Sequence, residues 1–101
     1  MKMDEQTALQ MGFRVQGRVQ GVGFRWWTRR TAAYLGLGGL VLNRTDGSVE
    51  VHAVGERESV ERFEARLAEG PPGSRVDGVE RVPSDRPLPD VFEIVSDFGC
   101  I

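Results

Sequence analysis

The sequence has little cysteine and little histidine: Cys100 and His52 are single instances in 101 residues. One cysteine forms neither an internal disulfide nor a cysteine-based zinc site, so we expect a reducing compartment, the cytoplasm. The sequence also lacks any run of about eighteen apolar residues, and residues 1–11 lack the apolar segment of a secretory signal. We therefore expect a protein that neither spans a membrane nor is exported.

An excess of charge of one sign is missing too. The 13 Lys and Arg residues face 15 Asp and Glu residues, for a net charge of −2. Such a balance provides no general field for a nucleic acid or an anionic membrane. Binding of RNA on an open sheet face is the weak alternative, because Arg14, Gln16 and His52 come without the paired aromatics that stack bases. We expect no nucleic acid and no membrane among the partners.

The spacing of apolar residues predicts the elements. Alternation at period two indicates strands, and stripes at three- and four-residue spacing indicate helices. Strands are expected at 12–18, 40–43, 48–54, within 74–83 with a bulge, and at 91–95, and helices at 26–35 and 56–69. This order is that of the ferredoxin-like, or split βαβ, fold. We predict an α+β sandwich with an antiparallel sheet, both helices on one face and a short extra C-terminal strand.

The chain is long enough for one domain with a modest core, given its 40% hydrophobic content. We place this domain at 12–95. The polar residues before it have little to bury, so 1–11 is predicted to be a flexible extension, and 96–101 a tail. Nothing in the sequence indicates what the extension or the tail with Cys100 does.

The most informative stretch reads GRVQGVGFR, from Gly17 to Arg25, and joins a predicted strand to a predicted helix. Glycine adopts positive φ freely, so successive backbone N–H groups here can converge on one point. The helix adds its unpaired N-terminal N–H groups and the positive end of its dipole, which together favour an anion. The guanidinium of Arg25 matches phosphate oxygens. A tight strand-to-helix turn with a surface arginine is an equally open interpretation.

Asn43 is the second candidate. It shares strand parity with Val41, so we expect its side chain to point toward the apolar side of the sheet. An amide both donates and accepts hydrogen bonds, which suits holding a water. From spacing alone, a turn-capping asparagine before Asp46-Gly47 has slightly better support. His52, by parity on the outward face, is expected to be a solvated strand residue and not a catalyst.

Together these residues resemble the acylphosphatase family. The resemblance covers about 13–94 and rests on GRVQGVGFR, on a second pattern G-x-V-x-N-x-x-x-G-x-V from Gly39 to Val49, and on Gly55 and Gly70-Pro71. It implies a ferredoxin-like fold and hydrolysis of small-molecule acyl phosphates to a carboxylate and inorganic phosphate. Because the leaving carboxylate is a weak base, we expect that the reaction needs no metal, and we expect no cofactor.

The resemblance also assigns roles. Arg25 matches the phosphate-binding arginine and Asn43 the water-orienting asparagine, the two expected catalytic residues. The expected phosphate cradle comprises Gly17, Val19, Gln20, Gly21, Val22, Gly23, Phe24 and Arg25. Which acyl phosphate is the physiological substrate is not indicated.

Two leucines, Leu40 and Leu42, depart from the family pattern and are expected on the sheet face that no helix covers. We expect a monomer, with weak self-contact through these leucines as the alternative. Two other functions stay open. The first is a binding module that holds a phosphate or carboxylate without turnover. The second is an accessory domain of a carbamoyl-transfer maturation protein, against which the lack of a Cys-x-x-Cys zinc pair argues.

Overall fold

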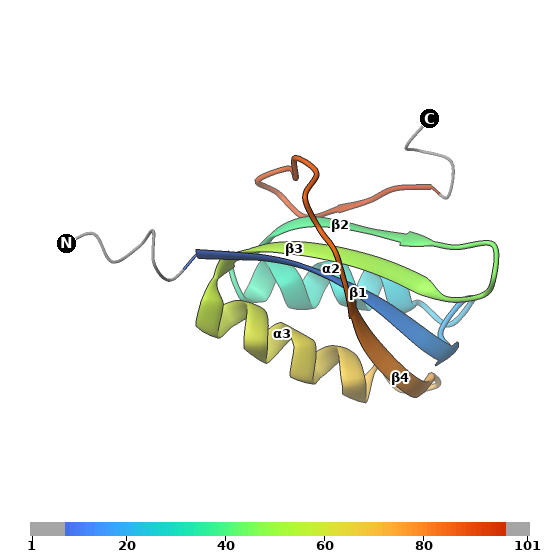
Figure 1. Cartoon of the computed structure of the whole chain (residues 1–101). Coiled ribbons are helices and arrows are strands. Elements are labelled where there is room, and N and C mark those ends of the chain that lie inside the picture. The colour runs from blue at the N-terminus through green and yellow to red at the C-terminus, as the bar shows by residue number, and fades with distance from the viewer. Residues whose placement is uncertain (1–7, 97–101) are drawn as a thin grey trace.

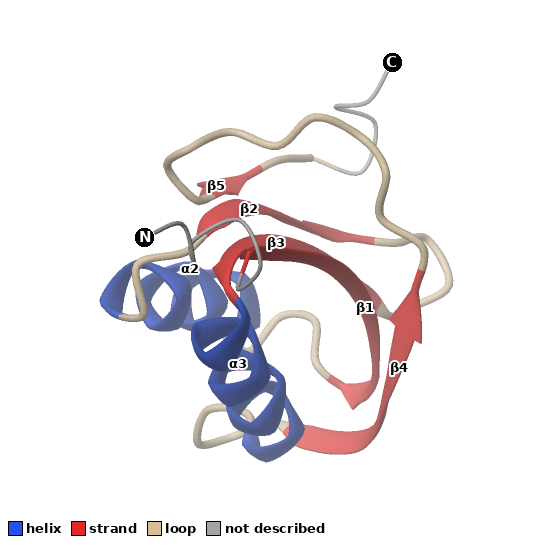
Figure 2. Cartoon of the chain, turned by 60° about the vertical axis from the view of Figure 1, so that its left-hand side comes forward, coloured by secondary structure: helices blue, strands red, loops and turns tan. Residues whose placement is uncertain are grey.

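The computed structural model describes residues 8–96. Its elements follow the predicted order, a strand, a helix, two strands, a helix and two strands. They are β1 (Ala8–Arg18), α2 (Phe24–Tyr34), β2 (Gly38–Asn43), β3 (Val49–Glu56), α3 (Arg57–Glu69), β4 (Arg75–Val82) and β5 (Glu93–Ile94). Both helices lie against one face of a curved sheet (Figures 1 and 2).

The sheet has the strand order β4-β1-β3-β2-β5. The first four strands pair antiparallel, which confirms the ferredoxin-like α+β fold. The extra strand differs from the prediction in two ways: it spans Glu93–Ile94 and not 91–95, and it runs parallel to β2. The reason is geometric. β4 ends at the end of the sheet where β2 begins, so a strand that follows directly after the crossing runs in the direction of β2.

The first strand begins earlier than predicted. β1 starts at Ala8, and residues 8–11 pair with the end of β3, from Ala8 opposite Glu56 to Met11 opposite Ala53. This part of the predicted extension therefore belongs to the sheet, because its backbone finds partners even though its side chains bury little. Residues 1–7 of the predicted extension, and 97–101 of the predicted tail with Cys100, lie outside the described residues.

The core lies between the sheet and the helices. The inward positions of β1, Phe13 and Val15, are fully buried, as is Phe63 of α3. The ring of Phe63 meets those of Phe13 and Phe92 edge-on, with centroids 6.3 and 5.9 Å apart. Phe92 thus anchors the chain just before β5, which holds this short strand against the edge of β2.

The opposite sheet face is covered in part, and two predictions are wrong for that reason. The chain from β4 to β5 crosses this face (Figure 1). Beneath it His52 is only 3% exposed, with Nδ1 2.7 Å from the Ser84 hydroxyl and Nε2 2.6 Å from a Glu50 carboxylate oxygen. Leu40 is 8% exposed and Leu42 half-buried. The expected exposed leucine pair is therefore absent, and His52 is not solvated.

Candidate active site

The loop between β1 and α2 exposes its backbone at two glycines. Gly21 and Gly23 have φ of +77° and +78°, and no atom lies within 4 Å of the position where a side chain would begin at either. Gly23 is also the N-cap of α2, in the left-handed conformation. Val19 is buried and Val22 packs against the core, so these two side chains anchor the loop. The backbone N–H groups therefore stay available at the surface.

Arg25 lies in the first turn of α2, where no acidic residue is present. A cation at this end of a helix is unfavourable next to the helix dipole. Within residues 8–96 the guanidinium forms no ion pair with a carboxylate. A bound anion would balance both the guanidinium and the dipole at once.

Asn43 is the last residue of β2 and pairs with Val49 of β3. Its side chain faces the helix side, as parity predicts, and its Oδ1 is buried without a hydrogen-bond partner in the described part of the chain. A buried amide oxygen without a partner costs free energy, on the order of 1–3 kcal/mol. This acceptor is therefore suited to a hydrogen bond from a water or a ligand.

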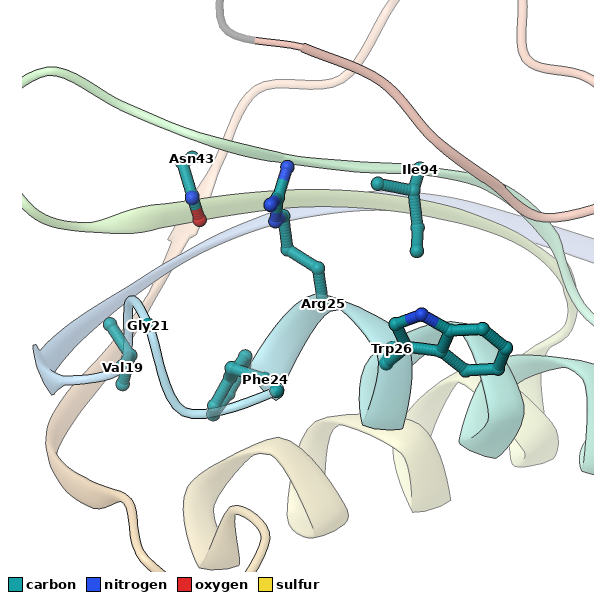
Figure 3. A pocket seen from close by; sticks show the side chains of 8 residues that line it. Val19, Gly21, Phe24, Arg25, Trp26, Asn43 and Ile94 are labelled. Atoms are coloured by element: carbon teal, nitrogen blue, oxygen red, sulfur yellow. The ribbon is translucent and has the colours of Figure 1, made fainter.

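The loop, Arg25 and Asn43 meet in one pocket of about 230 Å³ (Figure 3). The pocket combines the backbone of two glycines, one guanidinium and one amide with four apolar side chains. Its lining residues are Val19, Gly21, Gly23, Phe24, Arg25, Trp26, Asn43 and Ile94. Residues more than forty positions apart in sequence thus face one small space, from the loop between β1 and α2, from α2, from β2 and from β5.

Three of the predicted cradle residues do not line this pocket: Gly17, Gln20 and Val22. Gly17 lies in β1 with φ of +130°, and a Cβ there would overlap the carbonyl oxygen of Arg75. It sits at the register shift between β1 and β4, where the predicted bulge of β4 is found. Gly17 is thus explained by the close approach of two strands.

Gln20 reaches in the other direction. Its side-chain amide donates hydrogen bonds of 2.7 and 2.9 Å to the carbonyl oxygens of Arg44 and Ser48. Both acceptors belong to the turn between β2 and β3, directly after Asn43. Gln20 therefore joins the glycine loop to the turn that carries Asn43.

Two pocket residues were not among the predicted site residues: Trp26 and Ile94. Trp26 follows Arg25 in α2, and its 59% exposure is unusual for so large an apolar side chain. The family motif indicates its neighbour Arg25 as a site residue but does not indicate Trp26. Ile94 reaches the pocket only because β5 pairs with β2, which no local pattern in the sequence indicates.

Carboxylates near the site are engaged by their own neighbours. The hydroxyl and the backbone N–H of Ser48 donate hydrogen bonds of 2.6 and 2.9 Å to Asp46, which lowers the pKa of this carboxyl group. Burial opposes ionisation of Glu50, but hydrogen bonds from His52 and Arg44 outweigh it, so the pKa of Glu50 is also lowered. Both groups are thus held as carboxylates at neutral pH, fixed within the hairpin that presents Asn43.

Neither a metal cluster nor a membrane span appears in the part of the chain that the structure describes. Within residues 8–96, no three His, Cys, Asp or Glu side chains are grouped so that they could hold a metal ion. No helix there is long and apolar enough to cross a bilayer.

Comparison with known proteins gives a consistent result. The sequence profile named Acylphosphatase matches residues 11–94. An acylphosphatase of Nitratidesulfovibrio vulgaris is 49% identical over 85 residues, which cover 81% of this chain and 85% of that protein. A solved acylphosphatase from Coxiella burnetii superposes with a TM-score of 0.82 at 35% identity, over 94% of this chain and all of the other. A solved acylphosphatase from Bacillus subtilis superposes with a TM-score of 0.75 at 38% identity, over 85% of this chain and 97% of the other.

Proposed function

The chain belongs to the acylphosphatase family, and we propose that it hydrolyses acyl phosphates by direct attack of one water on phosphorus, without a metal or a covalent intermediate. The observation that supports this best is the shared pocket of Arg25 and Asn43. A cation without a carboxylate partner and a buried amide oxygen without a hydrogen-bond partner face the same space. The first suits a phosphoryl group and the second suits its attacking water.

The phosphoryl oxygens are proposed to bind to the loop and to α2. Backbone N–H groups around Gly21 and Gly23, and the first turn of the helix, provide donors and a positive dipole. Arg25 adds two parallel N–H donors and a full positive charge. Charge stabilisation of this kind supplies most of the rate enhancement expected for phosphoryl transfer, because little covalent chemistry is left to the protein.

The water is proposed to donate a hydrogen bond to Oδ1 of Asn43. The water oxygen then forms a bond to phosphorus as the bond from phosphorus to the acyl oxygen breaks, and the electron pair leaves with the carboxylate. A carboxylate is a weak base, so no enzyme acid has to protonate it. The water proton passes to a phosphate oxygen, which makes a protein base unnecessary.

The test is release of inorganic phosphate from acetyl phosphate. We expect Arg25→Ala and Asn43→Ala each to lower kcat/KM by about 100-fold or more, as removal of a transition-state donor does elsewhere. Arg30→Ala is the matched control, since Arg30 is exposed on the same helix and does not line the pocket. Circular dichroism verifies that each variant is folded.

Two outcomes would contradict the proposal. If folded Arg25→Ala or Asn43→Ala protein cleaves acetyl phosphate at the parent rate, the assigned roles are wrong. If the parent protein binds inorganic phosphate but releases none from acetyl phosphate, the domain is a binding module, the alternative from another functional class.

A further inference from the structure

The proposed active-site pocket has two chemically different ends. One end carries the polar groups, Arg25, Asn43 and the exposed loop backbone, together with the buried side chains of Val19 and Phe24. The other end is apolar and is formed by Trp26 and Ile94. Figure 3 shows the Arg25 guanidinium between Asn43 on one side and Ile94 and Trp26 on the other. A phosphoryl group bound to Arg25 therefore has a polar neighbour on one side and an apolar surface on the other.

The strand register also shows that the two ends of the pocket are separated along the sheet. Ile94 lies beside Val41 in the parallel pair of β5 and β2, and Asn43 follows Val41 by two residues on the same face of β2. Two residues of strand correspond to about 7 Å, and neighbouring strands are about 4.8 Å apart. Asn43 and Ile94 are thus separated along the direction of the strands by about the span of a small planar group.

An in-line displacement requires the attacking and leaving oxygens on opposite sides of phosphorus. If Asn43 holds the water, the acyl group leaves on the side of Trp26 and Ile94. We infer that these two side chains form an apolar wall for the acyl group, and that the preferred substrates are acyl phosphates with apolar, above all aromatic, acyl groups. Trp26 and Ile94 are then specificity-determining residues, whereas Arg25 and Asn43 act on the reacting atoms.

The surroundings of Trp26 support this role. Its indole is 59% exposed, so no core packing accounts for a residue of this size at this position. The guanidinium of Arg29 lies over the ring, 5.2 Å from the centroid, and this cation–π contact limits the orientations of the indole. An acyl group held there buries apolar surface away from solvent, and no flexible side chain has to be ordered for this.

The inference rests on the proposed function, and its test is the ratio of kcat/KM for benzoyl phosphate to kcat/KM for acetyl phosphate. We expect Trp26→Ala to lower this ratio by about five- to tenfold and Ile94→Ala by about threefold, mainly through a higher KM for benzoyl phosphate, as lost apolar contacts do. Hydrolysis of acetyl phosphate is expected to fall by less than that of benzoyl phosphate, because the acetyl group has little apolar surface to bury against the wall. Trp26→Phe is expected to restore at least half of the lost ratio.

Tyr34→Ala is the matched control, because Tyr34 is an aromatic residue of the same helix, 86% exposed, outside this pocket. An unchanged ratio in both Trp26→Ala and Ile94→Ala, with acetyl phosphate still cleaved, would overturn the acyl wall and leave the proposed function intact. Absence of cleavage of acetyl phosphate by the parent protein would refute the proposed function itself. Circular dichroism verifies that each variant is folded.

Discussion

The side-chain amide of Gln20 donates a 2.7 Å hydrogen bond to the carbonyl oxygen of Arg44, the residue directly after Asn43. A second bond from the same nitrogen, to Ser48, closes the link across the turn between β2 and β3. The loop that is proposed to hold the phosphoryl group is thereby tied to the hairpin that is proposed to hold the water. A fixed distance between the two matters, because a displacement of about 1 Å can cost two orders of magnitude in rate.

Substitution of Gln20 by alanine is expected to lower kcat for acetyl phosphate by about tenfold and to change the inhibition constant of inorganic phosphate by less than about twofold. The phosphate donors remain in place, while the position of the water relative to phosphorus loses its constraint. Steady-state kinetics with phosphate as a product inhibitor measures both quantities.

Gln16→Ala serves as the comparison for this experiment, since Gln16 is an exposed glutamine of β1. Gln20→Glu is a second variant for the same test. Its carboxylate faces two carbonyl oxygens and repels them, so we expect a lower kcat for Gln20→Glu than for Gln20→Ala. A variant that loses phosphate affinity in proportion to kcat would assign Gln20 to phosphate binding after all.

Substitution of Gly39 by alanine is expected to lower the free energy of unfolding by about 3 kcal/mol or more. Gly39 has φ of +139°, and a Cβ there would overlap the carbonyl oxygen of His52 in β3. At Gly47, φ is +96° but no atom lies within 4 Å of the added carbon, so Gly47→Ala should cost only about 1 kcal/mol. Urea unfolding of the two variants separates the cost of steric overlap from the cost of backbone strain. Equal losses in the free energy of unfolding would contradict the close approach of β2 to β3.

Substitution of Glu50 by glutamine is expected to destabilise the protein by about 1 kcal/mol at pH 7 and to have a progressively smaller effect as the pH falls below 4.5. The folded state lowers the pKa of Glu50 from the ordinary value of 4.5. Its stabilising contribution is therefore present above pH 4.5 and is lost as the pH falls through the lowered value. Thermal unfolding of the parent and the variant, from pH 7 to below pH 4.5, tests the direction of this pH dependence. Glu61→Gln, at an exposed position of α3, is the control. A difference that grows toward low pH would contradict the hydrogen bonds from His52 and Arg44.

Treatment with EDTA is expected to leave hydrolysis of acetyl phosphate unchanged. In the proposed mechanism Arg25 and backbone N–H groups supply the positive charge that a metal ion supplies in other phosphoryl transfers, and the carboxylate leaves without protonation. Phosphate release before and after dialysis against the chelator measures this. A large loss that added Mg²⁺ restores would refute the metal-free mechanism.

The sequence by itself determined the order of the elements and the family, and it indicated the two polar residues of the proposed site. These follow from local patterns: the GRVQGVGFR stretch contains both its backbone turn and Arg25, and strand parity alone places Asn43 on the helix side of β2. The hydrogen bonds of Gln20 were harder to predict. Its position in the loop predicted a contact with the phosphate, whereas its partners, Arg44 and Ser48, lie in another turn.

Only the tertiary structure decided what covers each face and what completes the pocket. Parity put His52 on the outward face but did not show that the chain after β4 crosses there and buries it. The same crossing brings β5 to the edge of β2 and places Ile94 in the pocket that Asn43 also lines. Periodicity fixes the direction in which a side chain points, because this depends on local backbone geometry. Its neighbours there depend on the meeting of segments far apart in the chain, which no local pattern encodes.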